Sequence, residues 1–455
     1  MDPFETPDFT IERLGPAQVP SPLAEMYGSA LSFFVGDDER TLYDTTGFSW
    51  HHNQMPFAID SVNLEVAGPR RFVYFNPAHT RAAIVTCGGL CPGINNVIRG
   101  LTHSLCLQYR IKQVLGIQYG YAGMVPGGYE PVELTPNFVE PIHLQGGSVL
   151  GSSRGPQPPE KMLEFLRQKE INLLFTIGGD GTQRGAWEVA RQARATGMNL
   201  AVVGVPKTID NDLNFVDKSF GFETAFSMAD QSLKAGHAEA KGAVNGVAIV
   251  KLMGRHSGYI TAVAALANGN VNFVLVPEVP FALDGPKGFL TILEKRLQRR
   301  GHAVVAIAEG AGQDLLEAEA GKLGYDASGN KRLADIGVFL KQQIEQHCKR
   351  QQVPVNVRYI DPSYIIRSAP ATPNDSVFCL QLAHHAAHAA MSGRTAMIVG
   401  IWKNTFTHVP LKEIVKEKKQ LDPNGPLWIS VLQATGQPMH MLNRQPQEVP
   451  TEQTE

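Results

Sequence analysis

The sequence predicts an α/β protein with two Rossmann-like lobes, mostly parallel sheets and an irregular N-terminal extension. From residue 82 onward, short apolar runs rich in β-branched residues alternate with segments of helical periodicity. Repeated strand–helix units of this kind form parallel sheets with right-handed crossovers. The 44 glycines, many of them directly after the apolar runs, are typical of strand-to-loop turns. The apolar runs are too numerous for one comfortable sheet, so we expect two lobes.

Each element is predicted from its local pattern. Strands are expected where apolar runs have strand length, and helices where apolar residues recur at helical spacing. Pro92 stands near the start of the first helix, where helices accept proline. The predicted strands are 82–86, 114–118, 173–177, 200–205, 247–252, 271–276, 304–307 and 355–360. The predicted helices are 95–108, 183–197, 222–237, 256–267, 286–300, 332–350 and 374–392.

We divide the chain where this pattern changes. The predicted parts are an irregular N-terminal extension 1–80 that packs on the main body, one lobe of 81–222 together with 366–415, a second lobe of 223–365, and a C-terminal segment 416–455. After about Gln437 the sequence is polar, and we expect a disordered tail.

The composition excludes several classes of protein. With 43% hydrophobic and 18% charged residues, the chain is typical of soluble globular proteins, and its net charge of -2 favours neither nucleic acid nor an anionic membrane. The five cysteines are scattered, so we expect no disulfide framework; Cys87 and Cys91 resemble a metal half-site, but no second half follows. The sequence shows no secretory signal and no apolar run near the ~20 residues of a membrane span, so we expect a cytoplasmic protein.

A glycine-rich turn with one acid follows the strand predicted at 173–177. It reads Gly178-Gly179-Asp180-Gly181-Thr182, at the carboxyl end of a buried strand, where open α/β sheets bind ligands. Glycines let backbone N–H groups approach phosphate, and the carboxylate can hold Mg²⁺. A capped turn without a ligand is the alternative. The lysine–threonine pair of a P-loop is absent, so the motif is not that of P-loop NTPases.

Two acids follow the strand predicted at 200–205. Thr208-Ile209-Asp210-Asn211-Asp212 would place both carboxylates on one side of an extended segment, because side chains alternate along such a segment. One carboxylate could take a hydroxyl proton as a base, while the other assists the metal or orients water. The alternative is a solvated polar turn.

Further polar groups follow other predicted strands. Arginine suits phosphate oxygens, and glycines at a helix start suit an anion. Together with the two acidic motifs, these groups favour a shared site for phosphoryl transfer. They are Gly88 and Gly89 after 82–86, Arg154 in 151–155, Met253-Gly254-Arg255 after 247–252, Glu309 after 304–307, and Tyr364 and Arg367 after 355–360.

With these residues in view, the chain resembles 6-phosphofructokinases, and more closely the longer ATP-dependent group of plants, trypanosomatids and some bacteria. The resemblance covers about 34–415. It is carried by the motifs Cys87 to Gly93, Gly178 to Ala186, Pro206 to Asp212, Lys251 to Arg255 and Tyr359 to Arg367.

The resemblance implies the reaction and the roles of the residues. The enzyme would transfer a phosphoryl group to the 1-hydroxyl of fructose 6-phosphate in glycolysis, with Asp210 as the base and Mg²⁺ at Asp180. The lobe containing 81–222 would bind the donor, and the lobe containing 223–365 the sugar phosphate. Implied donor-binding residues are Gly88, Gly89, Arg154, Gly155, Gly179, Asp180, Gly181 and Thr182. Implied substrate-binding residues are Thr208, Ile209, Asp210, Asp212, Met253, Gly254, Arg255, Glu309, Arg358, Tyr364, Ile365, Ile366 and Arg367, of which Thr208, Asp212 and Arg255 also assist catalysis beside Asp210.

The sequence departs from the short bacterial members of that family at two positions. Tyr364 stands where they usually have histidine, as in the longer group, and Asn245 where they carry an arginine from a neighbouring subunit. In this family a residue such as Arg358 can reach the site of a neighbouring subunit. The resemblance therefore implies a homodimer or homotetramer.

The phosphoryl donor depends on two positions. Pyrophosphate-using members typically replace Gly181 with aspartate, which would crowd and repel the α-phosphate of a nucleotide, so Gly181 favours ATP. Lys207 is common in pyrophosphate users but also occurs with glycine in ATP users. The alternatives are a pyrophosphate-dependent enzyme of the same fold and an inactive regulatory paralogue, although Asp180 and Asp210 are both present. NAD kinases and lipid kinases share only the Gly-Gly-Asp-Gly-Thr turn.

Overall fold

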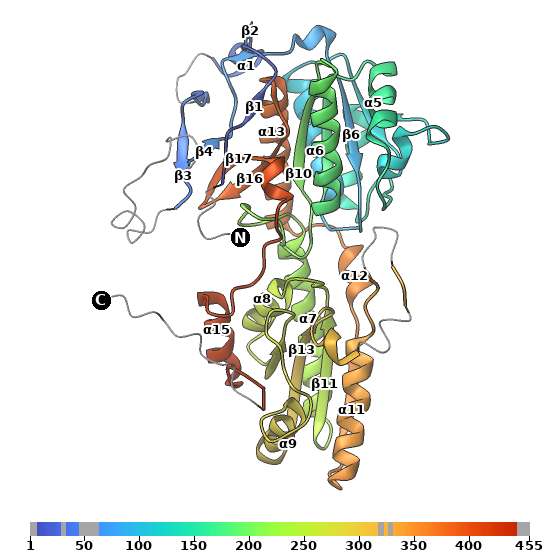
Figure 1. Cartoon of the computed structure of the whole chain (residues 1–455), viewed down its shortest axis with the longest axis vertical. Helices are drawn as coiled ribbons and strands as arrows, with labels where there is room; N and C mark the ends of the chain where they lie inside the picture. Colours follow the sequence, from blue (N-terminus) through green and yellow to red (C-terminus); the bar gives the residue numbers. More distant parts are fainter. Residues whose placement is uncertain (1–6, 29–32, 45–62, 317–322, 326–330, 444–455) are drawn as a thin grey trace, which may run out of the picture. The chain divides into compact units, whose positions relative to one another are not determined.

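The computed structural model describes residues 7–28, 33–44, 63–316, 323–325 and 331–443. Within them the chain forms two compact units (Figure 1). The first contains residues up to Ala225 together with Ile365–Lys419, and the second contains Phe226–Tyr325, Lys331–Tyr364 and the residues from Gln420 onward. The segments predicted as the first lobe thus lie in one unit, and the described end of the C-terminal segment joins the other.

A nine-stranded sheet forms the centre of the first unit. Its strand order is β3-β4-β17-β16-β10-β9-β6-β7-β8. The strands from β16 to β7 pair in parallel, whereas β8, β17, β4 and β3 pair antiparallel with their neighbours. Their bounds are β3 Arg40–Leu42, β4 Asn63–Val66, β6 Arg81–Thr86, β7 Gln113–Ile117, β8 Val132–Glu133, β9 Leu173–Gly178, β10 Ala201–Pro206, β16 Met397–Trp402 and β17 Thr405–Pro410.

Both faces of this sheet are covered, because its strands are apolar on both sides. Ile84 of β6 packs into one hydrophobic cluster with residues of α3 and α13, and Val85 packs into a second cluster with residues of α5 and α6. The bounds of the helices are α3 Ile94–His103, which continues as a π-helical turn Ser104–Gln108, α5 Pro159–Gln168, α6 Asp180–Ala195, α13 Pro373–Met391 and α14 Leu411–Ile414. The first unit is therefore a doubly wound sheet.

The second unit is built on a smaller, fully parallel sheet with the order β12-β13-β11-β14. Its hydrophobic core includes Ile249, Val305 and Leu340. The bounds are β11 Gly246–Leu252, β12 Phe273–Leu275, β13 His302–Ala308, β14 Asn356–Ile360, α8 Tyr259–Asn268, α9 Phe289–Arg300, α11 Ile336–Arg350 and α15 Pro426–Thr435. The boundary between the two units falls inside two helices, α7 Phe222–Lys241 and α12 Ser363–Arg367. No helix among the described residues is long and apolar enough to cross a membrane.

The N-terminal region is more regular than predicted. Its strands β3 and β4 extend the main sheet, and β1 Glu12–Arg13 pairs with β15 Arg394–Thr395. β2 Val19–Pro20 pairs with β5 Phe72–Val73, and α1 spans Leu23–Tyr27. Residues 1–6, 29–32 and 45–62 of the predicted extension lie outside the described residues.

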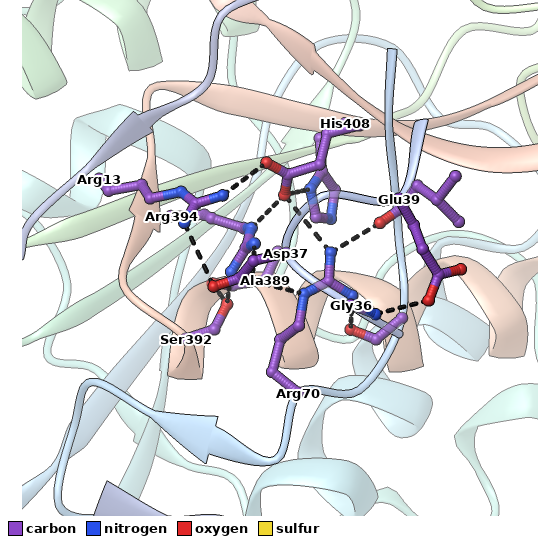
Figure 2. Close-up of polar contacts among 12 residues, drawn as sticks. Arg13, Gly36, Asp37, Glu39, Arg70, Ala389, Ser392, Arg394 and His408 are labelled. Atoms are coloured by element: carbon purple, nitrogen blue, oxygen red, sulfur yellow. Dashed lines mark hydrogen bonds and ion pairs between the residues drawn. The ribbon is translucent and has the colours of Figure 1, made fainter. Parts of the chain in front are cut away.

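A buried ionic cluster holds this region to the sheet (Figure 2). Glu65 of β4 accepts hydrogen bonds from Arg394 of β15, from Arg70, and from His408 of β17 at 2.9 Å. Asp37 accepts from Arg394 at 2.7 Å and from Arg70 at 3.1 Å. The cluster therefore joins strands that are more than 300 residues apart in the sequence, Glu65 and Arg394 being separated by 329 positions.

Two further features differ from what we expected. The tail was expected to be disordered after Gln437, but Ala282 N–H donates to the Met441 carbonyl at 2.7 Å, and the Met441 side chain is buried. Burial of this apolar residue holds the tail in place. Residues 444–455 lie outside the described residues. The strands β16 and β17 were not predicted, although they complete the main sheet.

Candidate active site

Three loops of the first unit meet at the carboxyl edge of its sheet. Thr86 of β6 pairs with Ile177 of β9, and Gly178 of β9 pairs with Pro206 of β10, so the three strands end side by side. Lys207 N–H donates to the Gly178 carbonyl at 3.1 Å. The Gly-Gly-Asp-Gly-Thr turn and the acidic loop after β10 are thus neighbours, as their positions after adjacent strands required.

Asp180 is the first residue of α6. Backbone N–H groups at a helix start favour negative charge, so this position suits both a carboxylate and phosphate oxygens. Arg184 Nη2 donates to Asp180 Oδ1 at 3.3 Å, and the Asp180 side chain keeps 23% of its surface exposed. Asp180 therefore keeps access to solvent at the edge of the sheet. Thr182 is buried, and Gln183 supports the turn by donating to the Gly178 carbonyl at 3.0 Å.

The acidic loop after β10 is a turn and not the extended segment that we predicted. Asn211 has a φ of 55°, a left-handed conformation that asparagine tolerates. Its side chain accepts a hydrogen bond from Ser219 N–H at 2.9 Å, and Ser219 Oγ donates to the Thr208 carbonyl at 2.6 Å. The argument from alternating side chains therefore does not apply to Asp210 and Asp212; the turn places them differently.

The two acids of this loop have different surroundings. Asp212 is buried; it accepts a hydrogen bond from the Thr208 hydroxyl at 2.5 Å, and its other carboxylate oxygen lies 3.7 Å from Lys418 Nζ. Asp210 is half-buried, and its N–H donates to Thr208 Oγ1 at 3.3 Å. The geometry therefore assigns Asp212 to holding Thr208, and leaves Asp210 as the more accessible acid.

A basic cluster borders the glycine loop after β6. Lys207 is buried and donates from Nζ to the Gly89 carbonyl at 2.8 Å. Burial lowers the pKa of Lys207, and the charges of Arg154 and Arg367 lower it further, while the thiols of Cys91 and Cys87 oppose this. Lys207 and Arg154 both lie against this loop, as expected for a site that receives phosphate.

Glycine is favoured in this loop by the conformation of Gly88, and Gly89 lies close to a basic side chain. Gly88 has a φ of 89°, and a Cβ at Gly89 would lie 3.2 Å from Arg154 Nη2. Ser152 Oγ donates to the Gly88 carbonyl at 2.6 Å, which joins the loop to the segment that carries Arg154 and Gly155. The structure thus brings together all the predicted donor-binding residues, since each lies in one of these loops.

Gly181 differs from its neighbours. A Cβ at Gly178 would lie 2.1 Å from Thr182 Oγ1, and one at Gly179 would lie 3.3 Å from the Lys207 carbonyl. A Cβ at Gly181 would meet nothing within 4 Å. Packing within the protein therefore does not require glycine at 181, and the free space lies in the first turn of α6.

The second unit carries a separate set of predicted residues at the carboxyl edge of its own sheet. Glu309 N–H donates to the Leu252 carbonyl at 2.9 Å, and Gly310 N–H donates to the Gly254 carbonyl at 3.1 Å. Gly254 has a φ of 127°, and a Cβ at Gly310 would lie 1.9 Å from the Arg255 carbonyl. The loops that bear Arg255 and Glu309 are therefore packed backbone to backbone.

The remaining predicted substrate residues are on β14 and α12. Arg358 is half exposed and lies 3.5 Å from Glu239, measured from Nε to Oε2. Tyr364 and Ile365 are exposed at 82% and 66%, whereas Ile366 is buried. Ile366 and Met253 are both at 0% exposure, backbone included, so neither presents surface to a substrate in this structure. Ile209 packs partly against the core of the first unit.

Three lysines were given no role in the sequence analysis. Lys419 Nζ donates to the Val216 carbonyl at 2.6 Å, and burial lowers its pKa to about 8. With Lys418 it places two cations beside the acidic loop; the sequence signal was the lysine run at 416–419. Lys251, in the second unit, lies between the carboxylates of Asp335 and Asp361.

The comparisons with known proteins agree with this geometry. The family profile of phosphofructokinases matches residues 81–390. An ATP-dependent 6-phosphofructokinase of Amycolatopsis methanolica is 47% identical over 437 residues, which is 95% of both chains. One from Borreliella burgdorferi is 42% identical over 96% of this chain and 99% of its own. One from Trypanosoma cruzi is 43% identical over 87% of this chain and 81% of its own.

Solved structures support the fold. A pyrophosphate-dependent phosphofructokinase from Marinobacter aquaeolei aligns with a TM-score of 0.64 at 23% identity, over 78% of this chain and 91% of its own. The Pichia pastoris phosphofructokinase aligns with a TM-score of 0.62 at 22% identity, over 80% of this chain and 40% of its own. At such identities the likeness concerns the fold and not the phosphoryl donor.

Proposed function

The chain belongs to the phosphofructokinase family, and from this premise we propose that it phosphorylates the 1-hydroxyl of fructose 6-phosphate with ATP, giving fructose 1,6-bisphosphate and ADP. The observation that carries the proposal is the register of β9 and β10, which sets the Asp180 turn beside the Asp210 loop. Its relatives over nearly the whole chain are named as ATP-dependent enzymes of this activity. The reaction belongs to glycolysis.

Each loop has a distinct part in the proposed reaction. The loops at Gly88–Gly89, Arg154–Gly155 and Gly179–Thr182 hold the phosphates of ATP through backbone N–H groups and the basic cluster. The oxygen of the sugar 1-hydroxyl attacks the γ-phosphorus of ATP, and Asp210 accepts the proton of that hydroxyl. The bond between the γ-phosphorus and the ADP oxygen breaks. Arg255 and Lys207 stabilise the negative charge on the transferred group. Asp212 keeps Thr208 in place beside the base.

The residues present fit Mg²⁺. This ion keeps several waters and usually takes one or two protein carboxylates, with nucleotide phosphates as its other ligands. Asp180 offers one partly exposed carboxylate at the start of α6. Among the described residues no group of three or more acidic, histidine or cysteine side chains forms a cage, and none is needed for this mode of binding. When bound, Mg²⁺ would neutralise charge on the donor phosphates.

The first test is to measure initial rates on fructose 6-phosphate and Mg²⁺ with ATP and with pyrophosphate, side by side. We expect turnover with ATP and little with pyrophosphate. Turnover with pyrophosphate alone would keep the sugar site but contradict the assignment of the donor. No turnover with either donor would favour an inactive paralogue.

Replacing Gly181 should change the choice of donor. We expect Gly181→Asp to lower kcat/KM for ATP by about ten- to a hundredfold, because a like-charge contact with the α-phosphate costs a few kcal/mol. The variant should fold, since a Cβ at this position meets nothing within 4 Å and an acid in a first helical turn is favourable. Steady-state kinetics and a melting curve check both points.

Gly181→Ala separates size from charge, because it adds the Cβ alone. We expect it to lose less ATP activity than Gly181→Asp. Equal ATP kinetics in Gly181→Asp and in the unmodified protein would contradict the argument that Gly181 makes room for a nucleotide.

We also propose that the protein is a cytoplasmic homodimer or homotetramer. The proposal is supported by Arg358, which is half exposed on the edge strand β14 and suits a contact with a neighbouring subunit's substrate. Light scattering after size-exclusion chromatography would give the mass of the protein in solution. A monomer that is fully active at assay concentration would contradict the proposed oligomeric state.

A further inference from the structure

A partly buried lysine joins two of the motifs on the sugar side. Lys251 is the penultimate residue of β11, just before Met253-Gly254-Arg255, and its side chain is 13% exposed. Its Nζ lies 2.9 Å from Asp335 Oδ2 and 3.0 Å from Asp361 Oδ2. The ammonium group therefore bridges two carboxylates that are 26 positions apart, one before α11 and one before α12.

Each of these carboxylates uses its other oxygen at the start of a helix. Asp361 Oδ1 accepts from Ser363 N–H at 3.0 Å and from Ser363 Oγ, where α12 begins. Asp335 Oδ1 accepts from Gly337 N–H at 3.0 Å and from Val338 N–H at 3.2 Å, at the N-terminus of α11. Lys251 thus orients two helix caps at once.

The charges make this arrangement depend on the lysine. Burial alone would lower the pKa of Lys251, but its hydrogen bonds to Asp335, Tyr359 and Asp361 raise it above the ordinary value, so the amine stays protonated. The pKa of Asp361 is lowered: burial opposes this, but its hydrogen bonds with Ser363 and Lys251 outweigh that effect. Without the ammonium group, two negative carboxylates would face each other.

α12 carries candidate substrate residues, Tyr364 in its first turn and Arg367 at its end. A helix of this length has no stable position of its own and takes it from its cap and its packing. Ile366 packs into the interior, while Asp361 fixes the entry of the chain. The direction in which Tyr364 and Arg367 point is therefore set partly through Asp361.

We propose that Lys251 is a positioning residue for the sugar phosphate: by holding Asp361 it fixes the start of α12, and so the placement of Tyr364 and Arg367. This inference rests on the proposed function. It predicts a selective effect, because Lys251, Asp335 and Asp361 belong to the second unit, whereas the donor loops belong to the first. Displacement of a positioning group by about 1 Å can cost on the order of a hundredfold.

The test is the Lys251→Met variant, which keeps the aliphatic stem and removes the charge. We expect KM for fructose 6-phosphate to rise by about tenfold or more, with KM for ATP within about threefold of the unmodified protein. Lys251→Arg should restore much of the loss, since it keeps a cation that can bridge both carboxylates. Lys234→Met, which removes an exposed ion pair with Asp230 on α7, is the matched control.

Two further variants separate the two caps. Asp361→Asn should reproduce the rise in KM for fructose 6-phosphate, whereas Asp335→Asn should reproduce little of it, because Asp335 caps α11 and not α12. If Lys251→Met does not fold, the KM values of Asp361→Asn and Asp335→Asn for fructose 6-phosphate test the proposal instead. An unchanged KM in Asp361→Asn, or an equal rise for both substrates, would overturn the proposal.

Calorimetric titration with fructose 6-phosphate distinguishes failure of the proposed reaction from failure of the positioning role of Lys251. If the unmodified protein binds the sugar phosphate but does not turn over, the proposed reaction fails while the Kd still tests Lys251. If it binds no sugar phosphate, both fail. A weakened Kd in Lys251→Met and Asp361→Asn, with Lys234→Met unchanged, supports the positioning role.

Discussion

Asp210→Asn is expected to lower kcat by about two to four orders of magnitude, the range that a positioned base contributes. The amide keeps the shape of the side chain but cannot take the proton of the 1-hydroxyl. The surrounding turn is held by hydrogen bonds of Asn211 and Ser219. KM for both substrates should therefore change little, because the variant loses an interaction that matters in the transition state.

The measurement is a full steady-state analysis of Asp210→Asn beside Asp38→Asn. Asp38 is an exposed acid of the first unit, so the control makes the same chemical change away from the site. Melting curves of both variants should match that of the unmodified protein. A kcat for Asp210→Asn within a few-fold of the unmodified protein would remove Asp210 from the role of base.

The edges of the parallel strands could be predicted because the information is local. The runs at 173–177 and 200–205 are apolar and short, and polar motifs follow each directly, which is enough to place the motifs at one edge of a sheet. The conformations of the loops were harder to predict from the sequence. The left-handed turn at Asn211 depends on Ser219, eight positions away, and it overturned the argument that Asp210 and Asp212 lie on one side of an extended segment.

The hairpin of β16 and β17 had a signal that was missed. An apolar run of strand length, Met397–Trp402, is followed by Lys403 and Asn404, which both adopt positive φ. Asparagine in a two-residue connection between strands is typical of hairpin turns. The sequence reading favoured repeated strand–helix units and therefore passed over an antiparallel pair at the end of the unit.

The strand β4 had no comparable signal. It reads Asn63-Leu64-Glu65-Val66, and Asn63 and Glu65 are polar residues that are nevertheless buried. Burial of Glu65 is favourable only because Arg394, Arg70 and His408 surround it, and Arg394 is 329 positions away. A charge that is compensated by so distant a partner cannot be recognised from local sequence.

The same cluster gives the second large effect (Figure 2). Glu65→Ala should lower the free energy of unfolding by about 3–5 kcal/mol, because the buried guanidinium groups of Arg394 and Arg70 lose their buried carboxylate and keep the exposed Asp37 as an acidic partner. The side chains of Arg394 and Arg70 are only 2% and 5% exposed, so water cannot replace the lost partner. Asp37→Ala is the comparison variant: it pairs with the same guanidinium groups, but its own side chain is 57% exposed, so we expect a smaller loss than for Glu65→Ala.

The pH dependence distinguishes this account from a simple loss of packing. Burial would raise the pKa of Glu65, but the hydrogen bond from His408 and the charge of Arg394 outweigh it and hold the pKa below its ordinary value of 4.5. A carboxylate with a lowered folded pKa stabilises the protein fully above the unfolded pKa, and this stabilisation is lost as the pH falls through the folded pKa. A loss of packing alone would leave the difference in unfolding free energy between Glu65→Gln and the unmodified protein unchanged below pH ~4.5, whereas loss of the charge makes it shrink there. Urea unfolding should show this shrinkage, after a constant difference from pH 7 to pH ~5. A difference that disappears within this window would mean that the charge of Glu65 does not hold the N-terminal strands to the sheet.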